Sequence, residues 1–201
     1  MSGLLIVCAA SYLVGSIPNG LIIGKVFWGI DLREHGSHNI GATNAWRTIG
    51  KVPGIAVFLL DLLKGVFGVY MGMLIGGTPL SMVLGGIFAI IGHSCSIFLG
   101  FSGGKGVATG LGVIVMMMPV PALIVFAVWF IIVKITGYVS LGSIVAAALV
   151  PVLSFAFARP AEITAFGVIA AALVIFRHKA NIVRLINGTE SKIKSGNMER
   201  K

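Results

Sequence analysis

The chain has 201 residues, of which 57% are hydrophobic and only 10% are charged. A soluble domain carries about 25% charged residues, so this composition excludes an ordinary water-soluble domain. The net charge of +9 does not indicate a nucleic-acid-binding protein, because the basic residues lie between long apolar runs and not on one basic face. Cys8 and Cys95 lie far apart in apolar stretches, so neither a disulfide framework nor a metal motif is predicted.

Apolar segments of nearly membrane-spanning length follow one another along the chain. A spanning helix needs about 20 apolar residues. We predict seven such helices, at residues 3–24, 52–76, 79–99, 106–120, 121–136, 139–157 and 161–177. The stretch from Gly15 to Pro18 is expected to kink the first of them. The predicted fold is an all-α, polytopic membrane helix bundle that forms a single domain, with a core at residues 1–188 and a basic tail at residues 189–201.

The distribution of lysine and arginine predicts the orientation of the chain in the membrane. With seven helices, the loops on one side and the C-terminal tail carry 13 basic residues, whereas the opposite loops hold only Arg159. Lysine and arginine are retained on the cytoplasmic side during insertion. The N-terminus is therefore predicted to lie outside and the C-terminus in the cytoplasm. The same basic residues can face anionic lipid headgroups, so membrane lipid is an expected partner and nucleic acid is not.

The first loop on the basic side, residues 34–47, is rich in small polar residues and glycine. Its candidate ligand-binding residues are Ser37, Asn39, Gly41, Thr43, Asn44 and Arg47. Small polar side chains donate hydrogen bonds, and a guanidinium group places two donors on a phosphate or carboxylate. The alternative is an ordinary solvated loop that ends in a helix cap.

The second loop on the basic side places glycines around a lysine at the start of a predicted helix. Its candidate residues are Gly103, Gly104, Lys105, Gly106 and Thr109. The N-terminus of a helix binds anions readily, so this loop favours phosphate binding over the alternative of a tight interhelical turn. A glycine follows Lys105 where a Walker A loop requires serine or threonine, so no nucleotide is predicted.

Two further polar clusters map to the same side of the membrane. Ser140 and Ser143 open the sixth predicted helix, and His178 and Asn181 follow the seventh. Ser140 could simply cap its helix. However, four polar clusters that are distant in sequence all lie at the cytoplasmic ends of helices, and the opposite side has nothing comparable. This asymmetry favours a water-accessible anion site at the inner membrane surface.

Ionisable residues also occur inside the predicted spans. Asp61 and Lys64 are three residues apart and share one helix face. Because charged groups in a span are costly and usually paired or functional, we predict an ion pair near the site that orients its cations. His93 is interpreted as a polar residue that is satisfied between helices.

These motifs together resemble a known family. Residues 36–47 resemble the first signature of the PlsY family, the bacterial acyl-phosphate:glycerol-3-phosphate acyltransferases. Gly92 and His93 with residues 103–109 are similar to its second signature, and residues 140–143 with His178 and Asn181 to its third region. The resemblance covers nearly the whole chain, in order. It implies that a fatty acyl group moves from acyl phosphate to the 1-hydroxyl of glycerol 3-phosphate. The products would be 1-acylglycerol 3-phosphate (lysophosphatidate) and inorganic phosphate, in the first step of phospholipid synthesis.

The same resemblance implies a location and a mechanism. The enzyme would lie in the bacterial inner membrane with its site facing the cytoplasm, and no metal or organic cofactor is implied. Acyl phosphate is already activated, so direct attack by the glycerol hydroxyl is the simplest route, with positioning and charge stabilisation supplying most of the rate. The expected catalytic residues are Arg47, Lys105, Ser143, His178 and Asn181, with Asp61, Lys64 and His93 in support. The base is either His178 or a phosphate oxygen of a bound substrate.

Two other functions compete with this interpretation. A transporter for an anionic phosphorylated metabolite would place its site near the midplane and show internal repeats, and neither is evident here. An alcohol phosphotransferase would use several carboxylates to hold metal ions. The chain has only six acidic residues, and apart from Asp61 they are scattered in loops and the tail.

Overall fold

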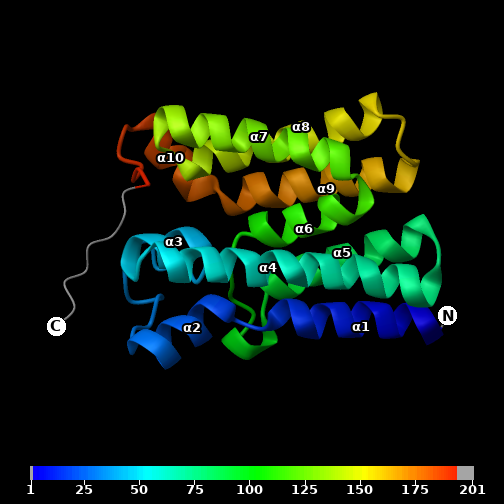
Figure 1. The fold of residues 1–201 in the computed structure, drawn as a ribbon, viewed down its shortest axis with the longest axis horizontal. Coiled ribbons are helices and arrows are strands. Elements are labelled where there is room, and N and C mark those ends of the chain that lie inside the picture. Colours follow the sequence, from blue (N-terminus) through cyan, green and yellow to red (C-terminus); the bar gives the residue numbers. More distant parts are fainter. Residues whose placement is uncertain (1, 194–201) are drawn as a thin grey trace.

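The computed structural model describes residues 2–193, whose regular structure is helical, with no strand (Figure 1). The long helices are α1 (Ser2–Ser16), α4 (Lys51–Met71), α5 (Pro79–Ser94), α7 (Pro119–Thr136), α8 (Val139–Ala156) and α9 (Ala161–Arg177). The shorter ones are α2 (Asn19–Trp28), α3 (Ala42–Thr48), α6 (Val107–Met117) and α10 (Lys179–Ile186). A π-helical turn (Gly72–Gly76) extends α4, and a 3-10 turn (Ile97–Leu99) follows α5. The last three basic residues of the predicted tail, Lys194, Arg200 and Lys201, lie outside the described part of the chain.

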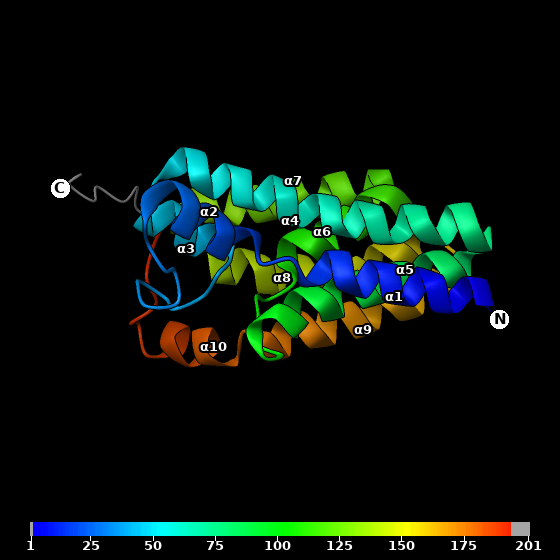
Figure 2. The ribbon, with the colours of Figure 1, turned by 90° about the horizontal axis from the view of Figure 1, so that it is seen from below.

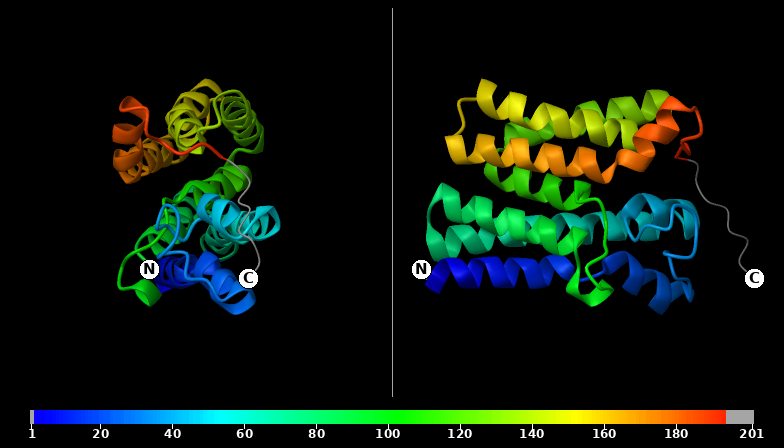
Figure 3. Two further views of the ribbon diagram at one scale, coloured as in Figure 1. Left: turned by 90° about the vertical axis from the view of Figure 1, so that its left-hand side faces the viewer. Right: turned by 180° about the vertical axis from the view of Figure 1, so that it is seen from behind.

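The helices form two groups that are visible end-on in Figure 3. Helices α1, α4, α5 and α6 pack on one another, and α7, α8 and α9 make the second group. The main cluster of buried apolar side chains joins both groups, from Val69 of α4 to Phe166 of α9. Large apolar residues such as Phe27, Ile135 and Phe155 also cover the outside. The bundle is therefore apolar both inside and out, as expected of a protein surrounded by lipid.

Within residues 2–193, length and composition allow four helical segments to cross a membrane: Ser2–Trp28, Lys51–Gly76, Pro119–Thr136 and Val139–Ala156. A fifth candidate is the pair α9 and α10, which is bent by 59°. Helices α5 and α6 are apolar but have only 16 and 11 residues. At 1.5 Å per residue α6 is about 17 Å long, against about 30 Å of hydrocarbon. The predicted all-helical class is confirmed, and each of the seven predicted segments contains a helix.

The expected kink in the first apolar segment is a break between α1 and α2 at Ile17 and Pro18. The buried Lys64 ammonium group donates a hydrogen bond to the carbonyl of Ile17, which the break leaves without a helical partner. Asp61 Oδ1 lies 2.8 Å from Lys64 Nζ and accepts a hydrogen bond from Asn19 Nδ2 at 3.1 Å. The ion pair thus places its positive end at the C-terminus of α1 and its negative end at the N-terminus of α2, complementing both helix dipoles.

The loop at residues 95–106 turns part-way along the bundle because α5 and α6 are short (Figure 2). Ser96 Oγ donates a 2.6 Å hydrogen bond to the carbonyl of Ser16, which ties the loop to the end of α1. Lys105 is consequently set back from the end of the bundle where α2, α3 and α10 lie.

Candidate functional site

A pocket of about 500 Å³ lies between the two helix groups, toward the end that carries α3 and α10. Its wall comes from the loop before α3, from each helix from α3 to α10, from the loop before α6 and from the segment after α10. The predicted site residues on this wall are Ser37, Asn39, Gly41, Thr43, Asn44, Arg47, Asp61, His93, Lys105, Gly106, Ser140, Ser143, His178 and Asn181. Folding therefore brings side chains from all four polar clusters together.

Other predicted residues lie behind this wall, namely Lys64, Gly103, Gly104 and Thr109. Gly104 packs directly on the His93 ring, and a Cβ atom at this position would overlap with Nε2 of that ring. Thr109 is fully buried, and its carbonyl packs against Gly65 of α4. Gly103, Gly104 and Thr109 shape the loop and the contact between α4 and α6. Lys64 instead holds the break between α1 and α2, and none of the four residues lines the cavity.

Arg177 holds the loop that carries Lys105. Its Nη2 atom donates to the carbonyls of Ser94, Gly103 and Gly104 at 3.0, 3.1 and 2.8 Å. The N–H of Gly104 in turn donates to the carbonyl of His93 at 3.0 Å. In the sequence, Arg177 is one of the 13 basic residues on the cytoplasmic side and was not singled out as a site residue. Its contacts with the loop span more than 70 residues, so no local pattern could have revealed them.

Lys105 projects from this loop into the pocket. Its ammonium group donates a 2.7 Å hydrogen bond to Asn181 Oδ1. Burial lowers the pKa of Lys105 to about 8; the carboxylate of Glu190 opposes this shift, and the charges of Arg184 and Arg47 add to it. Lys105 is therefore still cationic at neutral pH, and a bound anion would stabilise its charge.

Asn44 determines the shape of the loop before α3. Its side chain is buried, and its amide nitrogen donates to the carbonyls of Leu32, His35 and Asn39 at 2.9, 3.0 and 2.8 Å. Its oxygen accepts a hydrogen bond from the N–H of Ser37 at 2.9 Å. The amide is thus already occupied by the loop, so Asn44 positions its neighbours and does not offer a free donor to a ligand.

Arg47 extends from α3 toward the mouth of the pocket. Its Nη2 atom donates a 2.7 Å hydrogen bond to the carbonyl of Ser191. Its Nε atom is buried and has no hydrogen-bond partner among the residues that the structure describes. A buried N–H group without a partner is costly, and an anion in the pocket could satisfy it.

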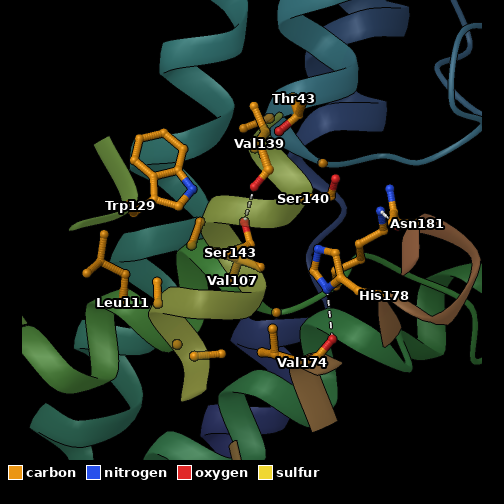
Figure 4. Close-up of a pocket in the computed structure, with 18 of the residues that line it drawn as sticks. Thr43, Val107, Leu111, Trp129, Val139, Ser140, Ser143, Val174, His178 and Asn181 are labelled. Atoms are coloured by element: carbon orange, nitrogen blue, oxygen red, sulfur yellow. Dashed lines mark hydrogen bonds between the residues drawn. The ribbon is translucent and has the colours of Figure 1, made fainter. Parts of the chain in front are cut away.

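His178 and Asn181 face Ser140 and Ser143 across the pocket (Figure 4). The Nδ1 atom of His178 lies 2.8 Å from the carbonyl of Val174. Because a carbonyl can only accept, Nδ1 carries the proton, and neutral His178 presents the lone pair of Nε2. Ser143 Oγ donates its own proton to the carbonyl of Val139 at 2.9 Å. The serine is therefore not hydrogen bonded to the histidine as an activated nucleophile would be.

Glu190 is a site residue that the sequence analysis missed. Its carboxylate is buried and accepts 2.7 Å hydrogen bonds from Ser140 Oγ, Asn181 Nδ2 and Arg184 Nε. Burial raises the pKa of Glu190, but these hydrogen bonds outweigh it and hold the pKa below its usual range. The only local signal was the rarity of acidic residues, of which the chain has six.

The segment after α10 forms one edge of the pocket mouth. The N–H of Ile193 donates a 2.7 Å hydrogen bond to the carbonyl of Gly137, and the Lys192 ammonium group lies 5.5 Å from the centre of the Tyr138 ring. With the contact between Arg47 and Ser191, these interactions fasten the segment across the ends of α3 and α8. Residues directly after 188 thus belong to the wall of the site.

Behind the polar mouth, the pocket continues as an apolar slot. The side chains that line it come from α6, α7, α8 and α9: Leu111, Ile114, Val125, Phe126, Trp129, Ala146, Ala147, Val150, Phe166, Ala170, Ala171 and Val174. One continuous cavity therefore offers cations and hydrogen-bond donors at its mouth and an alkyl-compatible interior. This combination suits an amphiphile with an anionic head and a hydrocarbon tail.

The sequence matches one family of known proteins along nearly its whole length. The family model described as glycerol-3-phosphate acyltransferase matches residues 5–188. The chain is 47% identical to glycerol-3-phosphate acyltransferase 2 of Moorella thermoacetica over 189 residues, covering 94% of this chain and 97% of that protein. It is 45% identical to the glycerol-3-phosphate acyltransferase of Fusobacterium nucleatum, covering 92% and 95%.

The fold is similar to solved structures as well. The crystal structure of PlsY (YgiH), an integral membrane glycerol 3-phosphate acyltransferase, in its glycerol 3-phosphate form matches with a TM-score of 0.91 and 39% identity, covering 95% of this chain and 96% of that one. Its lysophosphatidic acid form matches with a TM-score of 0.89 and 38% identity, covering 96% of both chains. The protein is thus an integral membrane protein that belongs to the glycerol-3-phosphate acyltransferase family.

Proposed function

We propose that this enzyme transfers a fatty acyl group from acyl phosphate to the 1-hydroxyl of glycerol 3-phosphate, giving 1-acylglycerol 3-phosphate and inorganic phosphate. The observation that carries the proposal is the continuity of the cation-lined mouth with the apolar slot. Both substrates bear phosphates, which suit Lys105 and Arg47, and one bears a chain that suits the slot. The crystal forms of the related PlsY with glycerol 3-phosphate and with lysophosphatidic acid support the acceptor and the product.

In the proposed reaction the glycerol hydroxyl oxygen attacks the acyl carbonyl carbon, and the bond from that carbon to the phosphate oxygen breaks. The hydroxyl proton passes to Nε2 of His178 or to an oxygen of a bound phosphate. Lys105 and Arg47 offset the phosphate charge, while Asn181 and Ser143 orient the reactants. No metal ion or organic cofactor takes part in these steps.

We further propose that transfer is direct, without an acyl-enzyme. The hydroxyls of Ser140 and Ser143 donate to Glu190 and to a backbone carbonyl, and no serine in residues 2–193 is hydrogen bonded to a histidine nitrogen. Radiolabelled acyl phosphate incubated without glycerol 3-phosphate should leave no stoichiometric label on denatured protein. Retained label that disappears in one serine variant would show a covalent route instead.

A phosphate-release assay tests the proposed function itself. Purified enzyme with acyl phosphate should release phosphate only when glycerol 3-phosphate is present, and 1-acylglycerol 3-phosphate should form in equal amount. A transporter for a phosphorylated metabolite would release none. Release without product would indicate a hydrolase.

The proposed location is the bacterial inner membrane, with the N-terminus outside and the site facing the cytoplasm, as the seven predicted segments imply. Helices α5 and α6, which have 16 and 11 residues, would make their passes by meeting at the loop of residues 95–106, which is set back within the bundle. The exposed Lys51 is the first residue of α4, which begins beside α3, and the exposed Arg159 lies in the loop between α8 and α9. Figure 1 shows these two places at opposite ends of the bundle. After replacement of Cys8 and Cys95, an impermeant thiol reagent on intact cells should label Arg159→Cys but not Lys51→Cys. The reverse labelling pattern would overturn this orientation.

The pKa of Lys105, lowered to about 8, predicts a pH dependence. Binding of a phosphate needs the protonated amine, so kcat/KM for glycerol 3-phosphate should fall as the pH rises above about 8. The second pKa of a phosphate monoester is about 6, so the charge of the substrate does not change in this range. In Lys105→Arg the guanidinium stays charged, so the remaining activity should not show this fall. An identical alkaline limb in both proteins would assign the titration to another group.

A further inference from the structure

We propose that Phe166 sets the length of the fatty chain that the enzyme accepts, because its ring forms the floor of the apolar slot. This inference rests on the proposed acyltransferase function and specifies its acyl donor further. It concerns the end of the pocket that lies farthest from the polar mouth.

The floor is built by one apolar side chain from each of four helices, and Phe166 is the largest of the four. Ile114 of α6, Val125 of α7, Val150 of α8 and Phe166 of α9 all line the pocket. Their exposed fractions are only 3, 5, 7 and 1%, and all four belong to the main buried core. The slot therefore ends against packed core, and a chain that reaches this floor meets side chains and not lipid.

The depth of the slot is fixed by regular helices. His178, which caps the C-terminus of α9, is twelve positions after Phe166, which corresponds to about 18 Å at 1.5 Å per residue. On α8, seven residues separate Val150 from Ser143, or about 10 Å. If the carbonyl group of an acyl chain lies between Ser143 and His178, the length of slot available to the rest of that acyl chain is fixed. Helices packed in a core do not stretch to accommodate extra methylene groups.

The walls of the slot indicate that it holds a single extended chain. Ala146 and Ala147 of α8 and Ala170 and Ala171 of α9 line it, so small side chains leave width between the two helices. In contrast to these alanines in the walls, the floor carries a large residue, since Phe166 is among the largest fully buried side chains in the described structure. Replacing it changes the depth of the slot more than any change at the neighbouring valines would.

The test compares kcat/KM for a series of saturated acyl phosphates of increasing length, each with glycerol 3-phosphate as acceptor. In Phe166→Ala the optimum should shift to longer chains. The ratio of kcat/KM for a chain two carbons longer than the wild-type optimum to that for the optimum should rise by roughly tenfold or more, since a methylene in an apolar pocket is worth at least that factor. Phe166→Trp should shift the optimum to shorter chains. Phe155→Ala on α8, whose ring is 81% exposed, is the matched control and should leave the profile unchanged.

A wild-type profile in an active Phe166→Ala enzyme would overturn the proposal, because the floor would then not limit the chain. Should Phe166→Ala fail to fold, Phe166→Leu leaves a smaller void and should give a smaller shift in the same direction; an unshifted profile there would equally overturn it. If the wild-type enzyme accepts no acyl phosphate of any length, the proposed function itself fails. That outcome is distinguishable from an unshifted profile.

Discussion

Replacing Lys105 by alanine is expected to lower kcat/KM for glycerol 3-phosphate by roughly ten- to a hundredfold. A hydrogen bond to a charged group is worth about 1.5–3 kcal/mol, which corresponds to this range. Lys105 is largely buried at the mouth of the pocket, where water cannot replace its charge, and the loop that carries it is held by Arg177. Steady-state kinetics on purified protein, with acyl phosphate saturating, measure the effect.

Two further variants make this result specific to the site. Lys105→Arg keeps the charge but replaces a compact ammonium group with a planar fork, so it should restore activity only in part. Lys134→Ala removes an exposed lysine from the same end of the bundle, outside the pocket wall, and should leave kcat/KM unchanged. Equal losses in Lys134→Ala and Lys105→Ala would point to a general electrostatic effect and not to a binding residue.

Glu190→Ala is expected to lower both stability and activity. Ser140 and Asn181 would lose their buried acceptor, at about 1–3 kcal/mol of unfolding free energy for each. The ion pair with Arg184 adds little, because the Arg184 side chain is 41% exposed. Displacing two groups of the site by about 1 Å can cost about a hundredfold in rate, so activity should fall by a similar factor in the protein that remains folded.

Thermal unfolding in detergent and kinetics at a temperature where the variant is folded separate these two effects. Glu162→Ala removes an exposed carboxylate at the opposite end of the bundle and is the matched control. Glu190→Gln keeps the shape of the side chain but weakens it as an acceptor, so its activity should lie between those of the wild type and Glu190→Ala. A stable and fully active Glu190→Ala variant would show that the site does not need Glu190 for its structure or its activity.

The membrane class, the helices and the polar end of the molecule could be predicted from the sequence. Apolar runs of near-spanning length and basic residues between them are local patterns, and each of the seven predicted segments contains a helix. The loops around Arg47 and Lys105 and the residues His178 and Asn181 were also identifiable, because glycine, basic and small polar residues stand out against an apolar background. Their similarity to one family then predicted a chemistry that composition alone could not.

Only the tertiary structure decided how these residues are used. The carboxylate of Glu190 and the guanidinium of Arg177 act through contacts between segments that lie far apart in the sequence. The shortness of α6 sets Lys105 back into the bundle, and the amide of Asn44 proves to be consumed within its own loop. The apolar slot and its Phe166 floor arise where four helices meet, and in the sequence their residues look like any other core positions. Local composition determines which segments enter the membrane, whereas the packing of distant segments determines which polar atoms remain free for a substrate and how deep the slot behind them is.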